Sequence, residues 1–418
     1  MDREPTAYIP DSIRDIFPGD FVYHLPPERI AGYPLPERDA SRLLVYRNGN
    51  ISEDLFRNLD SLLDEGSLLV YNDTRVIQAR LVFYKSSGAR IEIFCLEPED
   101  PTDYPQNFAS MSTCTWRCLV GNARKWKTGI LQKTFTRHHH TFLVTAEMSH
   151  SGEGYHSVRF SWDAPLSFGE ILDIAGLTPI PPYLGREAEA ADRERYQTVY
   201  SRINGSVAAP TAGLHFTDEV LKKLGQRNIR RVPVLLHTGA GTFKPVQADN
   251  ILDHVMHAEY FRISKKSIET VAGHPGKVIA VGTTTVRCLE SLYFIASQVT
   301  ANTGEPVFSL GQWEPYTMKR YPPAAEALNN LLTLMQASGW ETIEGSTRIM
   351  LVPGYRFTIP DAMLTNFHMP RSSLLMLIAA FTGNDWKKIY AYALEKGFRF
   401  LSYGDTSLLY RKQQRPDT

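Results

Sequence analysis

The spacing of hydrophobic residues changes twice along the chain, and each change predicts a different kind of structure. Residues 67–71, SLLVY, are a short apolar run typical of a buried strand, and the NDTR that follows predicts a turn. Between residues 80 and 160, apolar segments alternate with Gly, Ser and Asn, without clear helical periodicity. We expect strands there, from the segments ARLVFY, ARIEIFCL, TWRCLVG, ILQKTF, TFLVTAEM and YHSVRFSW.

After residue 166 the pattern alternates between strand and helix. Thr217 can cap a helix through its side-chain oxygen. Asp218 and Glu219, which follow it, are favourable in the first turn of that helix. The strand-like segments are VPVLLH, KVIAVG, RIMLV and FRFLSYG. The helix-like segments are TTTVRCLESLYFIAS, SSLLMLIAAF and WKKIYAYALEK, and AAEALNNLLTLMQ predicts a short helix within an excursion over residues 300–346.

The alternation predicts the α/β fold class. We expect a discontinuous α/β domain with a mostly parallel sheet, formed by residues 1–79 and 166–418. A small all-β barrel domain, residues 80–165, is inserted into it.

Charge excludes one class of protein and leaves another open. The chain has 418 residues, with 45 Lys and Arg against 45 Asp and Glu, so it is not a generally basic protein that coats nucleic acid. Residues 104–146 are nonetheless free of acidic residues and include Trp116, Trp126 and Phe135. This segment either binds RNA or is a solvated face; its cations are Arg117, Arg124, Lys125, Lys127, Lys133 and Arg137.

The sequence also disfavours a disulfide-stabilised protein, a metal site and a membrane-spanning or secreted protein. Four scattered cysteines do not make a disulfide framework, and no second pair completes a zinc site with Cys114 and Cys118. Residues 138–140 are consecutive histidines, which alternate faces on a strand and therefore converge poorly on a metal. The longest apolar run, residues 374–381, is far shorter than a membrane span, and the start of the chain lacks a signal peptide's apolar core. We expect a cytoplasmic protein.

Loops at strand ends carry the candidate chemistry. Residues 205–217, GSVAAPTAGLHFT, are rich in small residues and lead into a helix, where His215 is either an acid or base or a packed side chain. Residues 237–246, HTGAGTFKPV, follow a strand but lack the GxGxxG pattern of a dinucleotide site. GTTTVR, residues 282–287, either binds a carboxylate or phosphate or simply caps a core helix.

Two further segments hold polar side chains. His257 and Glu259 are two residues apart, so a strand would place both on one face, as a proton-transfer pair or a surface ion pair. Asn366, His368 and Arg371 precede an apolar helix, where they line a pocket or cap the helix.

The order and wording of these segments resemble the S-adenosylmethionine:tRNA ribosyltransferase-isomerase family of queuosine biosynthesis, from Tyr33 to Leu409. The segments that carry the resemblance are YPLPERDASRLL, YNDTRVIQARL, PIPPYL, ERYQTVYSRINGSVAAPTAGLHFT, HTGAGTFKPV, MHAEYF, AVGTTTVRCLES, PGYRFTIPDAMLTNFHMPRSSLLMLIAAFTG and FRFLSYGDTSLL. The resemblance implies an α/β domain with an inserted β-barrel.

It also implies a reaction. The ribosyl part of S-adenosylmethionine moves onto 7-aminomethyl-7-deazaguanine in a tRNA anticodon and rearranges to an epoxycyclopentane, with release of adenine and methionine. S-adenosylmethionine is then a co-substrate, and no metal, redox cofactor, membrane or obligatory protein partner is implied.

The matching motifs supply candidate positions, and the chemistry suggests their roles. As acids or bases we expect His215, His237, His257, Glu259, Asp361 and His368. For substrate binding we expect Arg75, Thr211, Gly213, Gly239, Gly241, Thr283, Thr284, Arg287 and Asn366. For RNA binding we expect Arg124, Lys125, Trp126 and Lys127.

The sequence departs from the family pattern in places. Residues 295–346 are longer than the usual connection, Arg348 stands where Asp is usual, and Gln78 replaces a Pro. Two alternatives follow, a paralogue that uses S-adenosylmethionine with another acceptor and an RNA-binding relative without catalysis. A methyltransferase is disfavoured because no Gly-rich loop with an acidic follow-up is present.

Overall fold

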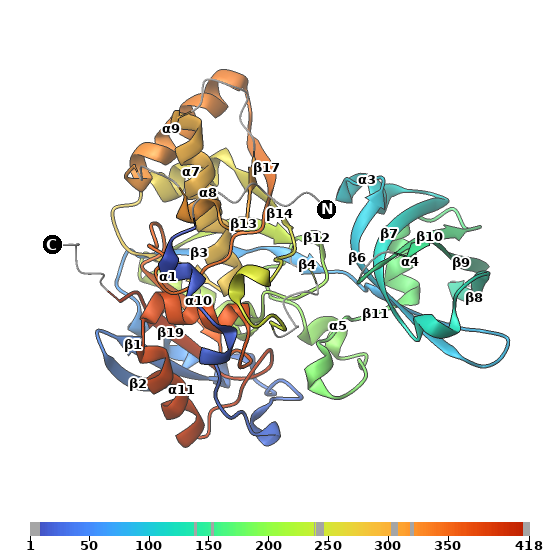
Figure 1. Cartoon of the computed structure of the whole chain (residues 1–418), viewed down its shortest axis with the longest axis horizontal. Coiled ribbons are helices and arrows are strands. Elements are labelled where there is room, and N and C mark those ends of the chain that lie inside the picture. Colours follow the sequence, from blue (N-terminus) through green and yellow to red (C-terminus); the bar gives the residue numbers. More distant parts are fainter. Residues whose placement is uncertain are drawn as a thin grey trace.

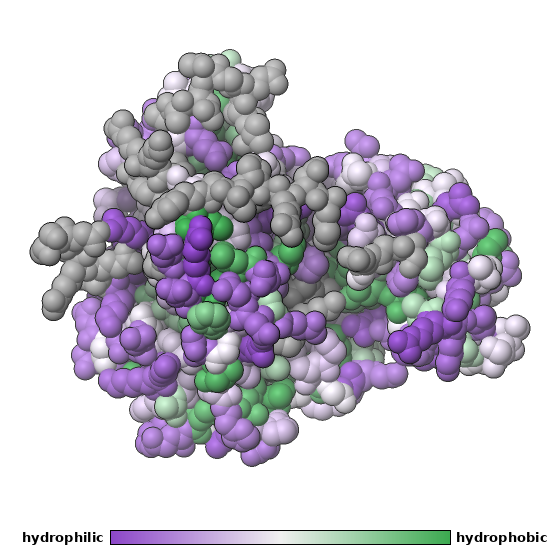
Figure 2. All heavy atoms as spheres, viewed as in Figure 1, coloured by the Kyte–Doolittle hydropathy of each residue, from purple (hydrophilic) through white to green (hydrophobic). Residues whose placement is uncertain are grey.

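The computed structural model has a main body and a smaller sheet set to one side of it (Figure 1). It describes residues 9–137, 140–151, 154–237, 239, 246–301, 308–317 and 322–412. Within these ranges no helix has the length and apolar character needed to cross a bilayer. The face drawn in Figure 2 is largely hydrophilic over both parts, with hydrophobic residues in small groups.

A ten-stranded mixed sheet forms the centre of the main body. Its order is β16-β17-β14-β13-β3-β15-β18-β19-β1-β2, and the four central strands β13, β3, β15 and β18 are parallel. The strands are β1 (Arg42–Arg47), β2 (Asn50–Leu55), β3 (Leu68–Asn72), β13 (Arg230–His237), β14 (Glu259–Ser264), β15 (Val278–Val281), β16 (Ser309–Leu310), β17 (Thr342–Thr347), β18 (Ala362–Asn366) and β19 (Thr406–Tyr410).

Alternate residues of the central strands pack into two different cores. In β15, Ala280 faces one core, whereas Ile279 and Val281 face the other, so both faces of the sheet are covered. The first core is covered by α7 (Lys265–Ala272), α8 (Thr283–Ala301), α9 (Ala324–Ser338), α10 (Ser373–Thr382) and α11 (Asp385–Glu395). The second is covered by α2 (Leu59–Leu62) and α6 (Asp218–Gln226); α1 (Asp11–Arg14) and α5 (Asp192–Arg195) are short.

The second sheet is curled and antiparallel throughout, in the order β11-β5-β6-β7-β10-β9-β8. Its strands are β5 (Arg80–Tyr84), β6 (Arg90–Asp100), β7 (Thr113–Gly121), β8 (Ile130–Arg137), β9 (His140–Ser151), β10 (His156–Trp162) and β11 (Gly176–Leu177). Trp116 and Phe160 pack against Phe168 of α4 (Phe168–Ala175) in its core. The strands expected from the apolar segments are therefore confirmed, whereas the domain boundaries stay a prediction.

Two predicted strands are wrong. Residues 348–352, RIMLV, are largely buried, but the Tyr316 hydroxyl satisfies their backbone, accepting from the Val352 N–H and donating to the Met350 carbonyl. In FRFLSYG, Leu401 has φ of 68°, which interrupts an extended strand, and β19 begins later at Thr406.

The predicted helices are confirmed. Thr217 caps α6, accepting from the Val220 N–H at 3.3 Å, as expected. The helix expected in the excursion is α9, with 15 residues. The helix α3 (Tyr104–Ala109) was not expected; the Asp103 side chain caps it by accepting from Gln106 N–H at 2.9 Å.

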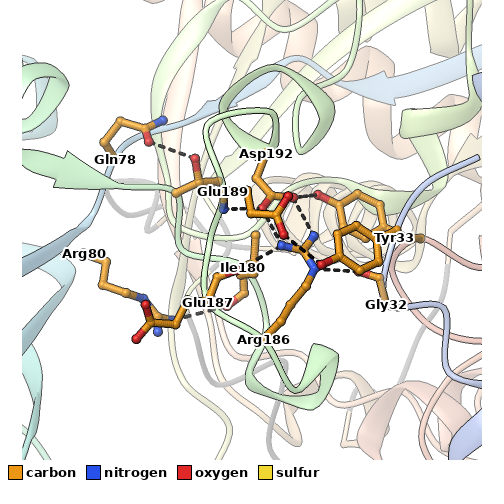
Figure 3. Close-up of polar contacts among 11 residues, drawn as sticks. Gly32, Tyr33, Gln78, Arg80, Ile180, Arg186, Glu187, Glu189 and Asp192 are labelled. Carbon is orange, nitrogen blue, oxygen red and sulfur yellow. Dashed lines mark hydrogen bonds and ion pairs between the residues drawn. The ribbon is translucent and has the colours of Figure 1, made fainter. Parts of the chain in front are cut away.

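Two adjacent chain segments join the two parts. The chain leaves the main body after β4 (Thr74–Val76), which pairs with β12 (Ile203–Ser206), and returns at β11 beside β5. Gln78 Oε1 accepts a 2.9 Å hydrogen bond from the Thr178 hydroxyl (Figure 3). A Cβ on Gly176 would lie 1.9 Å from the Gln78 carbonyl oxygen, so glycine is required for this close approach.

A polar network fixes the returning segment against the N-terminal region (Figure 3). Arg186 donates from both Nη atoms to the carboxylate of Asp192, at 2.6 and 2.7 Å, and from Nε to the Gly32 carbonyl at 2.8 Å. Tyr33 donates to Glu189 Oε1 at 2.7 Å. The bidentate Arg186–Asp192 pair orders the returning segment itself, and the bonds to Gly32 and Tyr33 tie it to the N-terminal region.

Candidate functional site

The carboxyl ends of the parallel strands lie along one edge of the main sheet, as the strand-to-loop segments predict. Asn72, at the end of β3, fixes this edge, because its side chain bonds both the N–H and the carbonyl of Leu236 in β13. Two cavities open along the edge, one narrow and one wide, and they gather different residues.

The narrow cavity, of about 70 Å³, lies at the ends of β15 and β18. Its lining comes from five distant segments: Tyr183, Ala208, Ala209, Pro210, Thr211, Ala212, Gly282, Thr283, Thr284, Thr365, Asn366, Phe367, His368, Met369, Ser372, Leu374, Leu401 and Ser402. The structure thus brings together five of the predicted site residues, Thr211, Thr283, Thr284, Asn366 and His368.

The start of α8 forms one wall of the narrow cavity. Gly282 has φ of 91°, and its carbonyl accepts from the N–H groups of Thr285 and Val286. For the N–H groups of Thr283 and Thr284, no hydrogen-bond acceptor is present among the described residues. A helix start with free N–H groups favours an anion, so this wall suits a carboxylate.

Asn366 forms the opposite wall and is 3% exposed. Its Nδ2 lies 3.5 Å from both His215 Nε2 and the Asp405 carbonyl oxygen. Its buried Oδ1 has no hydrogen-bond partner in the described part of the chain. A buried carbonyl oxygen without a donor is costly, and a ligand N–H group can remove that cost.

The two histidines near this cavity are neutral at pH 7. Burial lowers the pKa of His215 to about 4 and that of His368 to about 3. His215 Nδ1 lies 3.3 Å from the Arg38 carbonyl oxygen, which selects the tautomer with hydrogen on Nδ1 and leaves Nε2 as an acceptor. His368 Nε2 lies 2.9 Å from the Thr365 hydroxyl.

The wide cavity, of about 510 Å³, lies between the two sheets. It is lined by Leu96, Glu97, Pro98, Thr102, Asp103, Tyr104, Arg117, Leu119, Gly154, Tyr155, His237, Gly239, Val255, Met256, His257, Ala258, Tyr260, Ser346 and Arg348. Three of these, His237, Gly239 and His257, are predicted site residues. Arg348 is the residue that departs from the family pattern.

An aromatic cluster forms one side of the wide cavity. The His237 ring lies 4.6 Å from that of Tyr104 and 5.7 Å from that of Tyr260, centroid to centroid. Its Nδ1 lies 3.0 Å from the Thr74 hydroxyl, and burial lowers its pKa to about 3. A Cβ on Gly205 would lie 2.4 Å from the His237 ring, so this glycine allows the ring its position.

Charged groups of both signs line the same cavity. Arg117 donates to Glu97 Oε1 at 2.8 Å and to Glu99 Oε1 at 3.5 Å, and its guanidinium lies 5.1 Å from the Tyr155 ring centre. Asp103 caps α3 through Oδ1. The cavity therefore offers carboxylates beside aromatic rings.

Other predicted residues have structural surroundings. Glu259 and Arg287 are both buried and form an ion pair, with Oε2 and Nη1 2.6 Å apart. Arg287 Nε also donates to the Ile349 carbonyl at 3.3 Å. His257 precedes β14 and is exposed, so the two members of the expected His257–Glu259 pair lie in different environments.

Asp361 lies at the opposite edge of the sheet, where its Oδ2 accepts from the Val278 N–H at 2.9 Å at the start of β15. Arg75 is exposed on β4, opposite Asn204. A Cβ on Gly213 would lie 2.0 Å from the Tyr200 hydroxyl oxygen. Gly241, His138 and His139 lie outside the described residues.

The RNA-binding prediction needs one correction. Arg124, Lys125 and Lys127 are exposed between β7 and β8, whereas Trp126 is 1% exposed and donates from Nε1 to the Gly129 carbonyl at 2.9 Å. An indole buried in the core cannot stack on a base, so the assignment of Trp126 is wrong. In the described part of the chain no three His, Cys, Asp or Glu side chains form a metal site.

Most walls of the wide cavity were not predicted from the sequence. Glu97, Asp103 and Tyr104 belong to no quoted motif, and in MHAEYF only His257 and Glu259 were singled out, not Tyr260. An aromatic residue next to a helix cap is the only local signal at 103–104, and it is too common to single out a site.

Comparisons with known proteins extend over nearly the whole chain. A family model described as "Queuosine biosynthesis protein" matches residues 19–409. A protein of Geobacter sulfurreducens named S-adenosylmethionine:tRNA ribosyltransferase-isomerase is 39% identical over 401 residues, covering 94% of this chain and 99% of the relative. One from Halothermothrix orenii with the same name is 38% identical, covering 93% and 98%. A solved S-adenosylmethionine tRNA ribosyltransferase from Thermotoga maritima is 27% identical, covers 93% of this chain and 99% of that one, and has a TM-score of 0.45.

Proposed function

Because this chain belongs to the queuosine biosynthesis protein family, we propose that it is an S-adenosylmethionine:tRNA ribosyltransferase-isomerase. The enzyme transfers the ribosyl part of S-adenosylmethionine to 7-aminomethyl-7-deazaguanine in the anticodon of tRNA. Rearrangement of the ribose to an epoxycyclopentane gives epoxyqueuosine, and adenine and methionine leave.

One observation carries the proposal. Relatives that bear this name are 37–39% identical over 93–94% of the chain and 98–99% of their own length, so the likeness covers both sheets and every candidate loop. A paralogue with another acceptor or an RNA-binding relative without catalysis is not favoured by such a match.

The narrow cavity suits the methionine end of S-adenosylmethionine. Its carboxylate would accept hydrogen bonds from the N–H groups and hydroxyls of Thr283 and Thr284 at the start of α8. Its ammonium group would donate to Asn366 Oδ1, which otherwise lacks a partner in the described residues. Arg287, which we also expected to bind substrate, is already paired with Glu259.

The chemistry starts from the sulfonium cation, which acidifies the neighbouring ribose carbon. A base removes a proton there. The substrate amine displaces adenine at the anomeric carbon, and opening of the ribose ring leaves an imine carbon that the carbanion attacks to close the five-membered carbon ring. The ring oxygen freed in this way then displaces methionine to form the epoxide. The substrate's own amine, once it has lost the proton with which it binds, can serve as that base. Burial lowers the pKa of His215 to about 4 and that of His368 to about 3, and a bound cation lowers both further, so the two neutral rings are weak bases that suit orientation of the substrate by hydrogen bonds.

We also propose a role for the second sheet and the cellular compartment in which the enzyme works. The curled sheet is a small barrel; its strands β8 and β5 approach where Lys133 Nζ donates to the Val82 carbonyl at 3.0 Å. Arg124, Lys125 and Lys127 on this unit contact tRNA phosphates. The reaction takes place in the cytoplasm and needs no metal or redox cofactor.

The test is a turnover measurement. The protein is incubated with S-adenosylmethionine and tRNA that carries 7-aminomethyl-7-deazaguanine, and adenine release and the mass of the modified nucleoside are followed. We expect one adenine for each nucleoside converted, and none with tRNA that carries guanine. Absence of tRNA-dependent adenine release would overturn the proposal, and binding without turnover would support the non-catalytic relative.

A further inference from the structure

We propose that the wide cavity between the two sheets holds the acceptor base, flipped out of the tRNA loop, and that Asp103 and Glu97 recognise its aminomethyl cation. This inference rests on the proposed function and assigns its acceptor site. It places the base away from the exposed basic residues between β7 and β8, which the sequence analysis singled out for RNA contact.

Size and position support this assignment. The cavity of about 510 Å³ is several times larger than the narrow cavity of about 70 Å³. His237 ends β13 and Thr283 follows β15, and β3 alone separates these strands. Strands lie roughly 4.8 Å apart, so the two cavities open about 10 Å from each other along one edge. An acceptor base in one can therefore meet a donor bound in the other.

The walls of the cavity match a purine-like ring. Tyr104, His237 and Tyr260 form a cluster with ring centroids 4.6 to 6.1 Å apart. Extruded bases are commonly held by stacking on such side chains and by hydrogen bonds to their edges. His237 is neutral because burial lowers its pKa to about 3, so it adds no positive charge against a cationic base.

The charges select the aminomethyl group. Glu97 shares its Oε1 with Arg117 at 2.8 Å and offers Oε2 to the ligand, and its charge, second to burial, raises the pKa of the Tyr104 phenol. Asp103 uses Oδ1 to cap α3 and keeps Oδ2 for a ligand. Carboxylates also accept from the N1–H and amino groups of a guanine-like ring. The exposed Arg348 at the same cavity is placed to meet the phosphate of the extruded nucleotide.

The adenine of S-adenosylmethionine is the competing occupant, since it is also a flat heteroaromatic ring. Adenine carries no cation, so two carboxylates give it no advantage. If the acceptor base occupies the cavity, a variant that removes a carboxylate charge should weaken binding of tRNA. If adenine occupies it, the same variant should weaken binding of S-adenosylmethionine.

The binding experiment uses the free bases 7-aminomethyl-7-deazaguanine and guanine with the full-length protein, measured by calorimetry. Asp103→Asn keeps the cap of α3, because Asn caps helices as well as Asp. Glu97→Gln leaves Arg117 with Glu99. We expect the parent to prefer the aminomethyl base about tenfold, as for a hydrogen bond to a charged group, and each variant to lose most of that preference.

The kinetic experiment measures KM for tRNA and for S-adenosylmethionine separately. Both variants should raise KM for tRNA about tenfold and leave KM for S-adenosylmethionine unchanged. Tyr260→Ala should act in the same direction through lost stacking, with its thermal midpoint measured alongside. Asp173→Asn, an exposed residue of α4 paired with Arg193, is the matched control and should change neither constant.

A rise in KM for S-adenosylmethionine alone would assign the cavity to adenine and overturn the inference. Unchanged constants for both substrates, in variants that fold, would overturn it as well. A parent protein that prefers the aminomethyl base but releases no adenine would instead contradict the proposed function and leave the cavity assignment standing.

Discussion

The narrow and wide cavities lie on one sheet edge but are built in different ways. The narrow cavity is formed by segments with long sequence motifs, and its polar groups are backbone N–H, threonine hydroxyls and the amide of Asn366. The wide cavity combines His237, Gly239 and His257 from motif segments with walls that carry no motif, and its polar groups include charged side chains of both signs. Neutral, rigid donors suit the invariant end of a small co-substrate, whereas charges and rings across two sheets suit a base that arrives with a large RNA.

The largest effect should come from adding a methyl group to the tightly packed loop beside the narrow cavity. In Gly213→Ala the new Cβ would lie 2.0 Å from the Tyr200 hydroxyl oxygen and 2.8 Å from Thr198 Cγ2. We expect a loss of about 3 kcal/mol in the free energy of unfolding, measured with urea, because the half-buried Tyr200 ring packs against Tyr71 and Phe216 and cannot move away freely. Gly225→Ala in α6, with no atom within 4 Å of its Cβ, is the control and should gain up to about 1 kcal/mol. Equal stability of the two variants would contradict the packing described.

Lowering the pH should test the burial of the histidines beside both cavities. His215 and His237 have folded pKa values of about 4 and about 3, below the unfolded value of about 6.5, so the unfolded chain binds protons first as pH falls. Stability contributed by their neutral forms is complete above pH 6.5 and is lost as pH falls toward the folded values. Each should remove about 2 kcal/mol by pH 5.

Urea unfolding at pH 7 and pH 5 measures this loss. His237→Gln should show a smaller loss between the two pH values than the parent. If the variant lost as much as the parent, the ring of His237 would be solvated, and the wide cavity would be wetter than its aromatic wall suggests.

A smaller effect should separate the cavities by substrate. Asn366→Ala removes the oxygen that we assign to the methionine ammonium, and KM for S-adenosylmethionine should rise about tenfold while KM for tRNA stays constant. Asn384→Ala, an exposed residue whose side chain does not cap α11, is the control. A change in KM for tRNA alone would reverse the roles of the two cavities.

The smallest effect should come from the exposed cations of the second sheet. Replacing Lys125 and Lys127 by Ala should weaken tRNA binding about threefold and flatten its dependence on salt, because phosphate contacts release counterions. Lys266→Ala on α7 is the control. Binding that keeps its full salt dependence would show that this face is merely solvated.

Sequence pattern predicted the secondary structure wherever a single segment determines it. Alternation and caps identified the strands of the second sheet, the start of α6 at Thr217 and the helix α9. Pattern failed where a distant group decides, as in residues 348–352, where the Tyr316 hydroxyl bonds the Met350 carbonyl and the Val352 N–H, although the Arg348 N–H still donates to Leu310 of β16.

The same division applies to the site. Thr283, Thr284, Asn366 and His368 line one cavity because they lie at or just after the ends of β15 and β18, and carboxyl ends of parallel strands meet at one edge. The wide cavity was missed because Tyr104 and Tyr260 are 156 residues apart and meet only through the contact between the two sheets. Trp126 was misassigned because burial of a side chain next to exposed lysines cannot be read from their order.

The antiparallel contact between β5 and β11 has an evolutionary consequence. Leu81 and Gly176 face each other across this pair, so the ends of the second unit are neighbours. No strand of the ten-stranded sheet lies between them in the chain. A deletion of residues 82–175 closed by a tight turn would leave every pairing of that sheet in place. The second unit could thus have entered an ancestral chain in one genetic step without rethreading the rest.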